Sequence, residues 1–235
     1  MKKKLLLEIS VESVEAAAAA ERGGADRIEL CSDLSVGGLS PDVALLHAVQ
    51  QQIQIPIFVM IRPRPGDFHY PLAEFAQMKK SIAAAKGAGA SGLVLGILKR
   101  SRTVDIDRTR ELVELAQPLP VTFHRAFDAC PDLSQALEDV VRLGASRILT
   151  SGGAVSAVEG AANIAMLVAT SAARLTIIPG AGIHAGNILQ LAAATQAREF
   201  HSGLSTVLPR PQTDYVQFEK EVRAMVKMLS TLDPE

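Results

Sequence analysis

The sequence of 235 residues has little cysteine, no tryptophan and no long apolar run. Its two cysteines, Cys31 and Cys130, are too few for a disulfide-stabilised scaffold, so we expect both as thiols. No apolar run approaches the ~20 residues that a transmembrane helix needs. The 24 Lys and Arg residues balance 25 Asp and Glu residues, which leaves no basic stripe for nucleic acid. We therefore expect neither a membrane nor a nucleic acid as a partner.

The N-terminal segment also lacks the features of a secretory signal. Its apolar run covers only Leu5 to Leu7 before Glu8, and no small-residue cleavage site follows a long apolar region. We therefore predict a cytoplasmic protein, in which both thiols stay reduced.

What the sequence does contain is an eightfold alternation of short apolar runs with longer helical patterns. This alternation predicts parallel strands covered by crossover helices. The expected strands are residues 5–10, 26–31, 57–62, 92–98, 121–125, 147–151, 175–179 and 199–202. The expected helices are residues 11–22, 41–52, 72–86, 106–116, 133–143, 156–169, 185–194 and 214–229.

Short internal repeats support this reading. Gly24-Ala25, Gly89-Ala90 and Gly144-Ala145 each stand where a predicted helix ends and the next strand begins, and glycine is a common helix C-cap. Eight units without a linker-like change in composition favour an α/β fold of the (β/α)₈ TIM-barrel type, a single domain over residues 1–235. A doubly wound open sheet is the alternative, because periodicity does not prove closure.

Strand parity predicts which side chains enter the barrel. Alternate strand residues point into the lumen or toward the helices, and the helix-facing set must be apolar. Ile28 and Leu30 are therefore expected under helices. The expected lumen set is Glu8, Ser10, Arg27, Glu29, Cys31, Phe58, Met60, Arg62, Thr122, His124, Glu199 and His201. This interior is predicted to be unusually polar.

Three of these residues are candidates for proton transfer. Sites in such barrels form at the C-terminal ends of the strands, and Glu8, Glu29 and His124 fall at that end. Histidine can act as a general acid or base near neutral pH. The alternative is a buried ion network whose charges compensate one another, since an unpaired buried charge is costly.

A second group of residues at the same end suggests an anion site. Two glycine-rich turns follow the sixth and seventh strands, and their backbone N–H groups can cradle a phosphate or a carboxylate. Arginines in the stretches RPRPGDFHY (62–70) and HRAFD (124–128) can pair with the same anions. The candidate anion-binding residues are Arg62, Arg64, Arg125, Ser151, Gly152, Gly153, Gly180, Gly182, His201 and Ser202. The alternative for the glycines is that they only form tight turns.

Cys31 has three interpretations. It is a small buried apolar residue, a nucleophile with a lowered pKa, or a ligand for a soft ion such as Cu(I). A soft ion needs a second sulfur ligand nearby, for which Cys130 and Met60 are the candidates in the sequence.

The order of several short motifs resembles the CutC family of copper homeostasis proteins. The motifs are ELC (29–31), GGLSP (37–41), VMIRPR (59–64), GDF (66–68), VTFHRAFD (121–128), ILTSGG (148–153), PGAGI (179–183) and EFHS (199–202). The resemblance implies a cytoplasmic TIM barrel, often a homodimer, that binds Cu(I) through cysteines at the barrel mouth. Cys31 matches one such cysteine, whereas Ser10 stands where the family has the other.

Two functions follow from these patterns. The resemblance implies copper homeostasis, with a copper ion bound at the mouth and Cys31 as its ligand. The residues themselves favour an enzyme that acts on a small anionic or phosphorylated metabolite by acid/base chemistry. A barrel that only binds such a ligand is a third alternative, because a fold does not determine a function.

Overall fold

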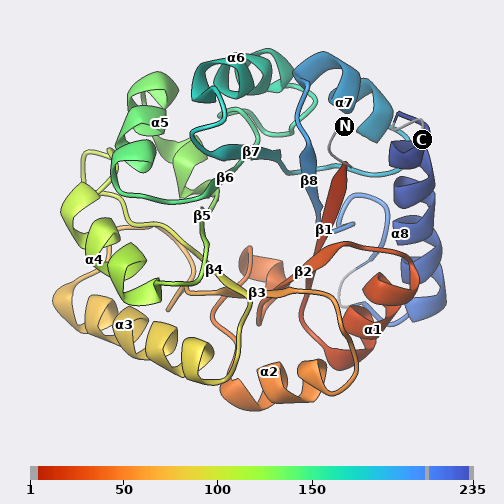
Figure 1. The fold of residues 1–235 in the computed structure, drawn as a ribbon, viewed down its shortest axis with the longest axis horizontal. Coiled ribbons are helices and arrows are strands. Elements are labelled where there is room, and N and C mark those ends of the chain that lie inside the picture. The colour runs from red at the N-terminus through yellow and green to blue at the C-terminus, as the bar shows by residue number, and fades with distance from the viewer. Residues whose placement is uncertain (1–4, 210–211, 233–235) are drawn as a thin grey trace.

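The computed structural model describes residues 5–209 and 212–232, and in it eight parallel strands form a ring inside a layer of helices (Figure 1). The strands are β1 (Leu6–Val11), β2 (Arg27–Leu30), β3 (Ile57–Met60), β4 (Gly92–Leu95), β5 (Val121–Phe123), β6 (Arg147–Thr150), β7 (Thr176–Pro179) and β8 (Glu199–Ser202). The helices are α1 (Val14–Arg22), α2 (Val43–Gln50), α3 (Leu72–Gly87), α4 (Ile106–Ala116), α5 (Leu133–Arg142), α6 (Ala161–Ser171), α7 (Ile188–Thr195) and α8 (Tyr215–Ser230).

The strand order confirms the predicted barrel. Hydrogen-bonded neighbours run in the order β7-β6-β5-β4-β3-β2-β1-β8, and β7 and β8 lie side by side where the ring meets (Figure 1). Each helix from α1 to α7 returns the chain to the start of the next parallel strand, as crossover connections require. The predicted limits of 1–235 include terminal residues outside the described ones, so those limits stay a prediction.

Several strands end earlier than predicted. β2 ends at Leu30, β3 at Met60 and β5 at Phe123, so that Cys31, Arg62 and His124 stand in the loops that follow. Residues 34–36 and 125–129 form short 3₁₀ helices in two of these loops. The chain thus leaves the sheet at the point where polar side chains begin to gather.

The first helix starts later than predicted for a local reason. α1 begins at Val14, not at residue 11, because the hydroxyl of Ser13 accepts the N–H of Ala16 and caps the helix. Serine is among the preferred residues at this position, where it satisfies an otherwise unpaired donor.

The predicted strand parity is confirmed. Leu7, Ile9, Ile28 and Leu30 belong to the large apolar core between strands and helices. A separate, small cluster inside the barrel contains Cys31, Phe58, Met60 and Val94. The two clusters lie on opposite faces of the same sheet, as alternation requires.

A buried ion network fills the part of the lumen near the starts of β2, β6 and β8. Arg27 donates to Glu8 at 2.5 Å and to Glu199 at 2.7 Å, and Arg147 donates to Glu199 at 3.2 Å. Both guanidinium groups also stack over the ring of Phe58, at 4.6 and 4.9 Å from its centre. The alternative interpretation of compensated charges therefore holds for this layer.

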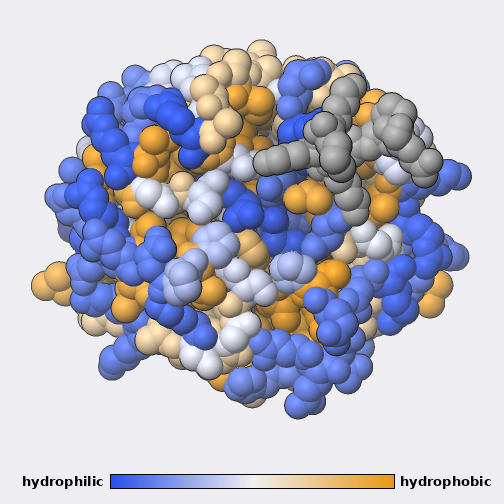
Figure 2. Space-filling model, viewed as in Figure 1, coloured by the Kyte–Doolittle hydropathy of each residue, from blue (hydrophilic) through white to orange (hydrophobic). Residues whose placement is uncertain are grey.

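The hydropathy of the surface agrees with a polar interior. On the face seen in Figure 1, hydrophilic residues cover much of the rim and also continue into the centre of the ring (Figure 2). No helix among the described residues is long and apolar enough to cross a membrane.

Candidate functional site

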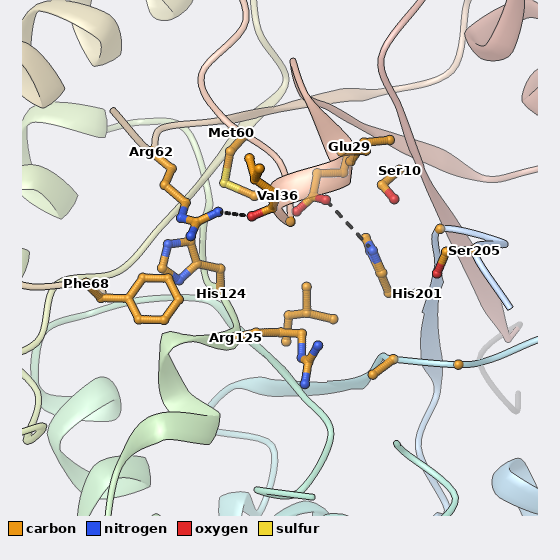
Figure 3. Close-up of a pocket in the computed structure, with 16 residues that line it drawn as sticks. Ser10, Glu29, Val36, Met60, Arg62, Phe68, His124, Arg125, His201 and Ser205 are labelled. Carbon is orange, nitrogen blue, oxygen red and sulfur yellow. Dashed lines mark hydrogen bonds and ion pairs between the residues drawn. The ribbon is translucent and has the colours of Figure 1, made fainter. Parts of the chain in front are cut away.

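A cavity of about 320 Å³ opens at the C-terminal ends of the strands. It is lined by Ser10, Glu29, Leu34, Val36, Gly37, Met60, Arg62, Phe68, His124, Arg125, Leu149, Ala181, Gly182, His201, Gly203 and Ser205. Six of the predicted site residues are among them, namely Glu29, Arg62, His124, Arg125, Gly182 and His201. In Figure 3, Arg62 and His124 lie on one side of the open centre, and Glu29 and His201 lie on the other.

Arg62 is a buried cation with no carboxylate partner among the described residues. Its side chain donates to the carbonyl oxygens of Val36 at 2.8 Å, Gly38 at 3.1 Å and Gly66 at 3.2 Å. The residue is 6% exposed, and none of the ion pairs between described residues involves it. Carbonyl dipoles hold the guanidinium in place but leave its charge uncompensated, so the cavity wall attracts an anion.

His124 lies next to this arginine and stays neutral. Burial and the Arg62 charge lower the pKa of His124 to about 3. Its Nδ1 accepts the N–H of Ala126 at 3.2 Å, which places the imidazole proton on Nε2. The ring packs against Phe68, with 5.0 Å between ring centres. The predicted proton transfer by His124 is not favoured by so low a pKa, and its Nε2–H is suited to donate a hydrogen bond.

Three ionisable residues from adjacent strands form the opposite wall and its base. His201 Nδ1 lies 2.7 Å from Glu8 Oε1, and His201 Nε2 lies 3.8 Å from Glu29 Oε2. Burial raises the pKa of Glu8, but Arg27 and His201 outweigh it and lower this pKa to about 2. Glu8 therefore belongs to the ion network beneath the cavity and does not line it.

The other two residues of this group have raised pKa values. Burial raises the pKa of the Glu29 carboxyl to about 7. Burial lowers the pKa of His201, but the carboxylates of Glu29 and Glu8 outweigh it and raise this pKa above its ordinary value. Of the three residues predicted to transfer protons, Glu29 is thus the one whose pKa lies near neutral pH.

Cys31 lies behind the cavity wall. It is fully buried and donates weakly to Glu29 Oε2 at 3.6 Å. Burial and the Glu29 charge raise its pKa well above the ordinary value, so the sulfur stays a thiol. Met60 shares its cluster, whereas Cys130 packs in the core outside the barrel.

Cu(I) fits these residues poorly. Cu(I) prefers thiolate and thioether ligands, but apart from the Met60 thioether the cavity wall presents carboxylate oxygen and imidazole nitrogen. Ser10, which lines the cavity, offers only a hydroxyl. The Cys31 sulfur is buried behind the wall and carries a proton.

The glycine turn after β6 binds an anion that the chain itself supplies. The Asp128 carboxylate accepts the hydroxyl of Thr150 at 2.5 Å, the N–H of Ser151 at 3.0 Å and the N–H of Gly153 at 3.2 Å. Arg125 completes the set with an ion pair at 2.8 Å. The donors around this turn, which were predicted to hold an external anion, therefore already bind a carboxylate of the protein itself.

Three other residues that were predicted to bind an anion, Arg64, Ser202 and Gly180, contribute to the structure of the protein instead. Arg64 pairs with Glu74 at 2.9 Å and with Asp67 at 2.8 Å, away from the cavity lining. The Ser202 hydroxyl donates to the carbonyl of Ile183 at 2.6 Å and links the end of β8 to the loop after β7. A Cβ at Gly180 would lie 2.5 Å from Leu149, so this glycine is required for packing.

Sequence reasoning did not assign two features of the site. Val36 and Gly37 line the cavity from the 3₁₀ turn after β2, and Asp128 organises the β6 turn. Gly37 and Gly38 were noted only as part of the GGLSP motif, and only the fold shows that this segment lines the cavity. The role of Asp128 was not visible in the sequence, because the donors from the β6 turn lie more than 20 residues away from it.

Comparisons with known proteins identify relatives of the whole chain. A family model described as CutC family matches residues 5–206. A CutC family protein of Xylella fastidiosa is 43% identical over 95% of this chain and 88% of its own length. The human protein named copper homeostasis protein cutC homolog is 48% identical over 83% of this chain and 72% of its own length.

A solved structure also supports the fold. The crystal structure of a copper homeostasis protein CutC from Streptococcus agalactiae superposes with a TM-score of 0.81 at 31% identity. It covers 85% of this chain and 98% of its own.

Proposed function

This chain belongs to the CutC family, and from that premise we propose that the mouth of its barrel binds a small anionic metabolite with Arg62 as the counter-ion. The observation that carries the proposal is a buried guanidinium, lining the cavity, that pairs with no carboxylate among the described residues. Uncompensated buried charge is costly, and a bound anion removes that cost.

The dimensions and donors of the cavity support a small ligand. A volume of about 320 Å³ is at the lower end of the range for metabolite sites. The imidazole of His124 offers a further donor, and Phe68 offers an apolar face beside it. A phosphate or carboxylate group fits this combination of a cation and a neutral N–H donor.

The test compares two arginines of the same motif. We expect inorganic phosphate and a panel of phosphorylated and carboxylated metabolites to include a ligand that stabilises the wild-type protein. At about 100 times its Kd, such a ligand raises the melting temperature by about 5–10 °C. Arg62→Met should abolish the shift, whereas Arg64→Met should keep it, because Arg64 pairs with Glu74 and Asp67. A shift that is unchanged in Arg62→Met would contradict the proposal.

We propose copper as a second, family-based candidate for the bound species. The human relative's name supports it, and so does the shared cluster of Cys31 and Met60, which brings together two sulfur side chains. The poor match of the cavity wall to Cu(I) speaks against it.

An anaerobic Cu(I) titration against a chromophoric competitor tests this candidate. If copper is bound here, wild-type protein takes up one equivalent, Cys31→Ala loses it, and Cys130→Ala keeps it because Cys130 lies in the other cluster. Absence of stoichiometric uptake by wild-type protein would end the copper candidate without affecting the anion site.

Three expectations from the sequence stay predictions. They are the cytoplasmic location, the homodimer and the proton transfer by Glu8, Glu29 and His124.

A further inference from the structure

Glu8, Glu29 and His201 come from three strands that are neighbours in the ring. β1 lies between β2 and β8, and Glu8 is in register with His201. The carboxylate and imidazole ligand atoms of the three residues all lie within 4.8 Å of one another. Glu29 and His201 also line the mouth cavity and point toward one another at its edge (Figure 3).

The hydrogen bond between His201 and Glu8 determines the orientation of the imidazole. Glu8 is held as a carboxylate by Arg27 at 2.5 Å, so it accepts and His201 Nδ1 donates, at 2.7 Å. The proton on Nδ1 leaves the lone pair on Nε2. A carboxylate that orients a histidine in this way is the usual second partner of a metal-binding imidazole.

The distance between Nε2 of the His201 imidazole and the Glu29 carboxylate suits a bound ion. His201 Nε2 lies 3.8 Å from Glu29 Oε2, which is too far for a hydrogen bond. Two ligand atoms that each lie ~2.0–2.2 Å from one metal ion can be separated by this distance. A cation placed there would replace the proton that the two carboxylates otherwise hold on His201.

A second, independent observation points to a missing partner. Glu29 is 3% exposed, and its Oε1 atom is buried without a hydrogen-bond partner among the described residues. An unsatisfied buried acceptor of this kind is energetically unfavourable. A cation bound by the Glu29 carboxylate would satisfy it.

We propose that His201 Nε2 and the Glu29 carboxylate bind a divalent transition-metal cation at the edge of the cavity, with Glu8 orienting His201. The oxygen and nitrogen ligands suit ions such as Zn²⁺ and Mn²⁺ and do not suit Cu(I). Two protein ligands leave coordination positions open on the cavity side for water or for an anion. The cation site does not depend on the anion site at Arg62, which lies across the cavity (Figure 3).

Calorimetric titration of the chelator-treated full-length protein with MnCl₂ or ZnSO₄ alone tests the site. We expect one equivalent to bind to wild-type protein. Glu29→Gln and His201→Gln should each weaken binding by tenfold or more, and Glu8→Gln by about 10–100-fold through the misoriented imidazole. His184→Gln, a histidine outside the cavity lining, should bind as wild type does.

A measurement on wild-type protein removes the dependence on variants that fold poorly. Electron spin echo modulation of bound Mn²⁺ should show coupling to one directly bound imidazole nitrogen. Lack of stoichiometric binding, lack of nitrogen coupling, or unchanged affinity in a folded His201→Gln would overturn the inference. Arg62→Met should keep the cation while losing the anion, so failure of one proposal is distinguishable from failure of the other.

Discussion

At the scale of single residues, two charged side chains near the opening of the barrel differ in how far their charges are compensated by other groups of the protein. Asp128 is an anion saturated by donors from its own chain, whereas Arg62 is a cation held by carbonyl groups and the ring of Phe68, with no carboxylate paired to it among the described residues. Both belong to motifs that the sequence marked as anion-binding. Only the second has unsatisfied capacity, which is why the anion site is assigned to Arg62 and not to the glycine turn.

Asp128→Ala should destabilise the β6 turn. Removing the carboxylate leaves the buried hydroxyl of Thr150 and the buried N–H of Ser151 without this acceptor, and each unsatisfied buried donor costs about 1–3 kcal/mol. We expect the free energy of unfolding in urea to fall by about 2–4 kcal/mol. Millimolar phosphate or acetate should restore part of the loss by filling the vacated cradle.

Asp107→Ala is the matched control. The Asp107 side chain is 90% exposed and lies 3.9 Å from Arg110, so its loss should change stability by under about 0.5 kcal/mol. Equal losses in the two variants would show that the Asp128 contacts contribute nothing specific.

At the scale of elements, the lumen is packed by an interplay between neighbouring strands. Gly92 in β4 is in register with Phe58 in β3, and the absence of a side chain at 92 leaves room for the aromatic ring. That ring in turn lies between the guanidinium groups of Arg27 and Arg147. A strand glycine here serves the packing of the ion network beneath the cavity.

Gly92→Ala should therefore destabilise the barrel. A Cβ at this position would lie 2.5 Å from the Phe58 ring, and the ring is confined by the two arginines. Overpacking of this kind costs about 1–3 kcal/mol, measurable by chemical unfolding. A compensating Phe58→Leu change should recover part of it.

Gly87→Ala, at the end of α3, is the control for Gly92→Ala and should stabilise the protein slightly. An added Cβ there meets nothing within 4 Å, and alanine is favoured over glycine in helices by up to ~1 kcal/mol. The prediction for Gly92 fails if both variants change stability in the same direction by the same amount.

At the scale of the whole molecule, the buried ionisable groups link stability to pH. The pKa of Glu8 is about 2 in the folded protein, so its contribution is present above pH 4.5 and is lost as the pH falls toward 2. The pKa of Glu29 is about 7, so its contribution is present below pH 4.5 and is lost as the pH rises toward 7. The raised pKa of His201 acts in the same direction as that of Glu29.

The pKa of His124, lowered to about 3, makes stability rise with pH up to 6.5, and this opposes the Glu29 contribution between pH 4.5 and 6.5. The metal-free protein should consequently be most stable between about pH 4.5 and 6.5. Urea unfolding from pH 3 to pH 8, in the presence of a chelator, measures this. Glu29→Gln should reduce the decline above about pH 6.5, and Glu8→Gln should reduce the decline below pH 4.5. Stability that rises steadily to pH 8 would contradict the assignment of these shifts.

The sequence by itself determined the architecture and the two faces of its strands. Eight alternations of apolar runs with helical patterns are a local, periodic signal, and parallel strands covered by helices follow from it because crossover helices force parallel pairing. Closure of these strands into a barrel, which periodicity does not prove, is shown by the strand order and the contact between β7 and β8. Parity placed Ile28 and Leu30 under helices and Glu29 in the lumen for the same reason, since side chains alternate with a period of two.

Only the tertiary structure decided which polar residues are satisfied and which are available. Arg62 and Arg64 stand two positions apart in one motif, yet one lines the cavity and the other pairs with two carboxylates. Glu8 and Glu29 look alike along their strands, but Arg27 reaches the first and leaves an oxygen of the second unpaired. Pairing between residues far apart in the chain depends on distances in three dimensions, and these carry no periodic signal in the sequence.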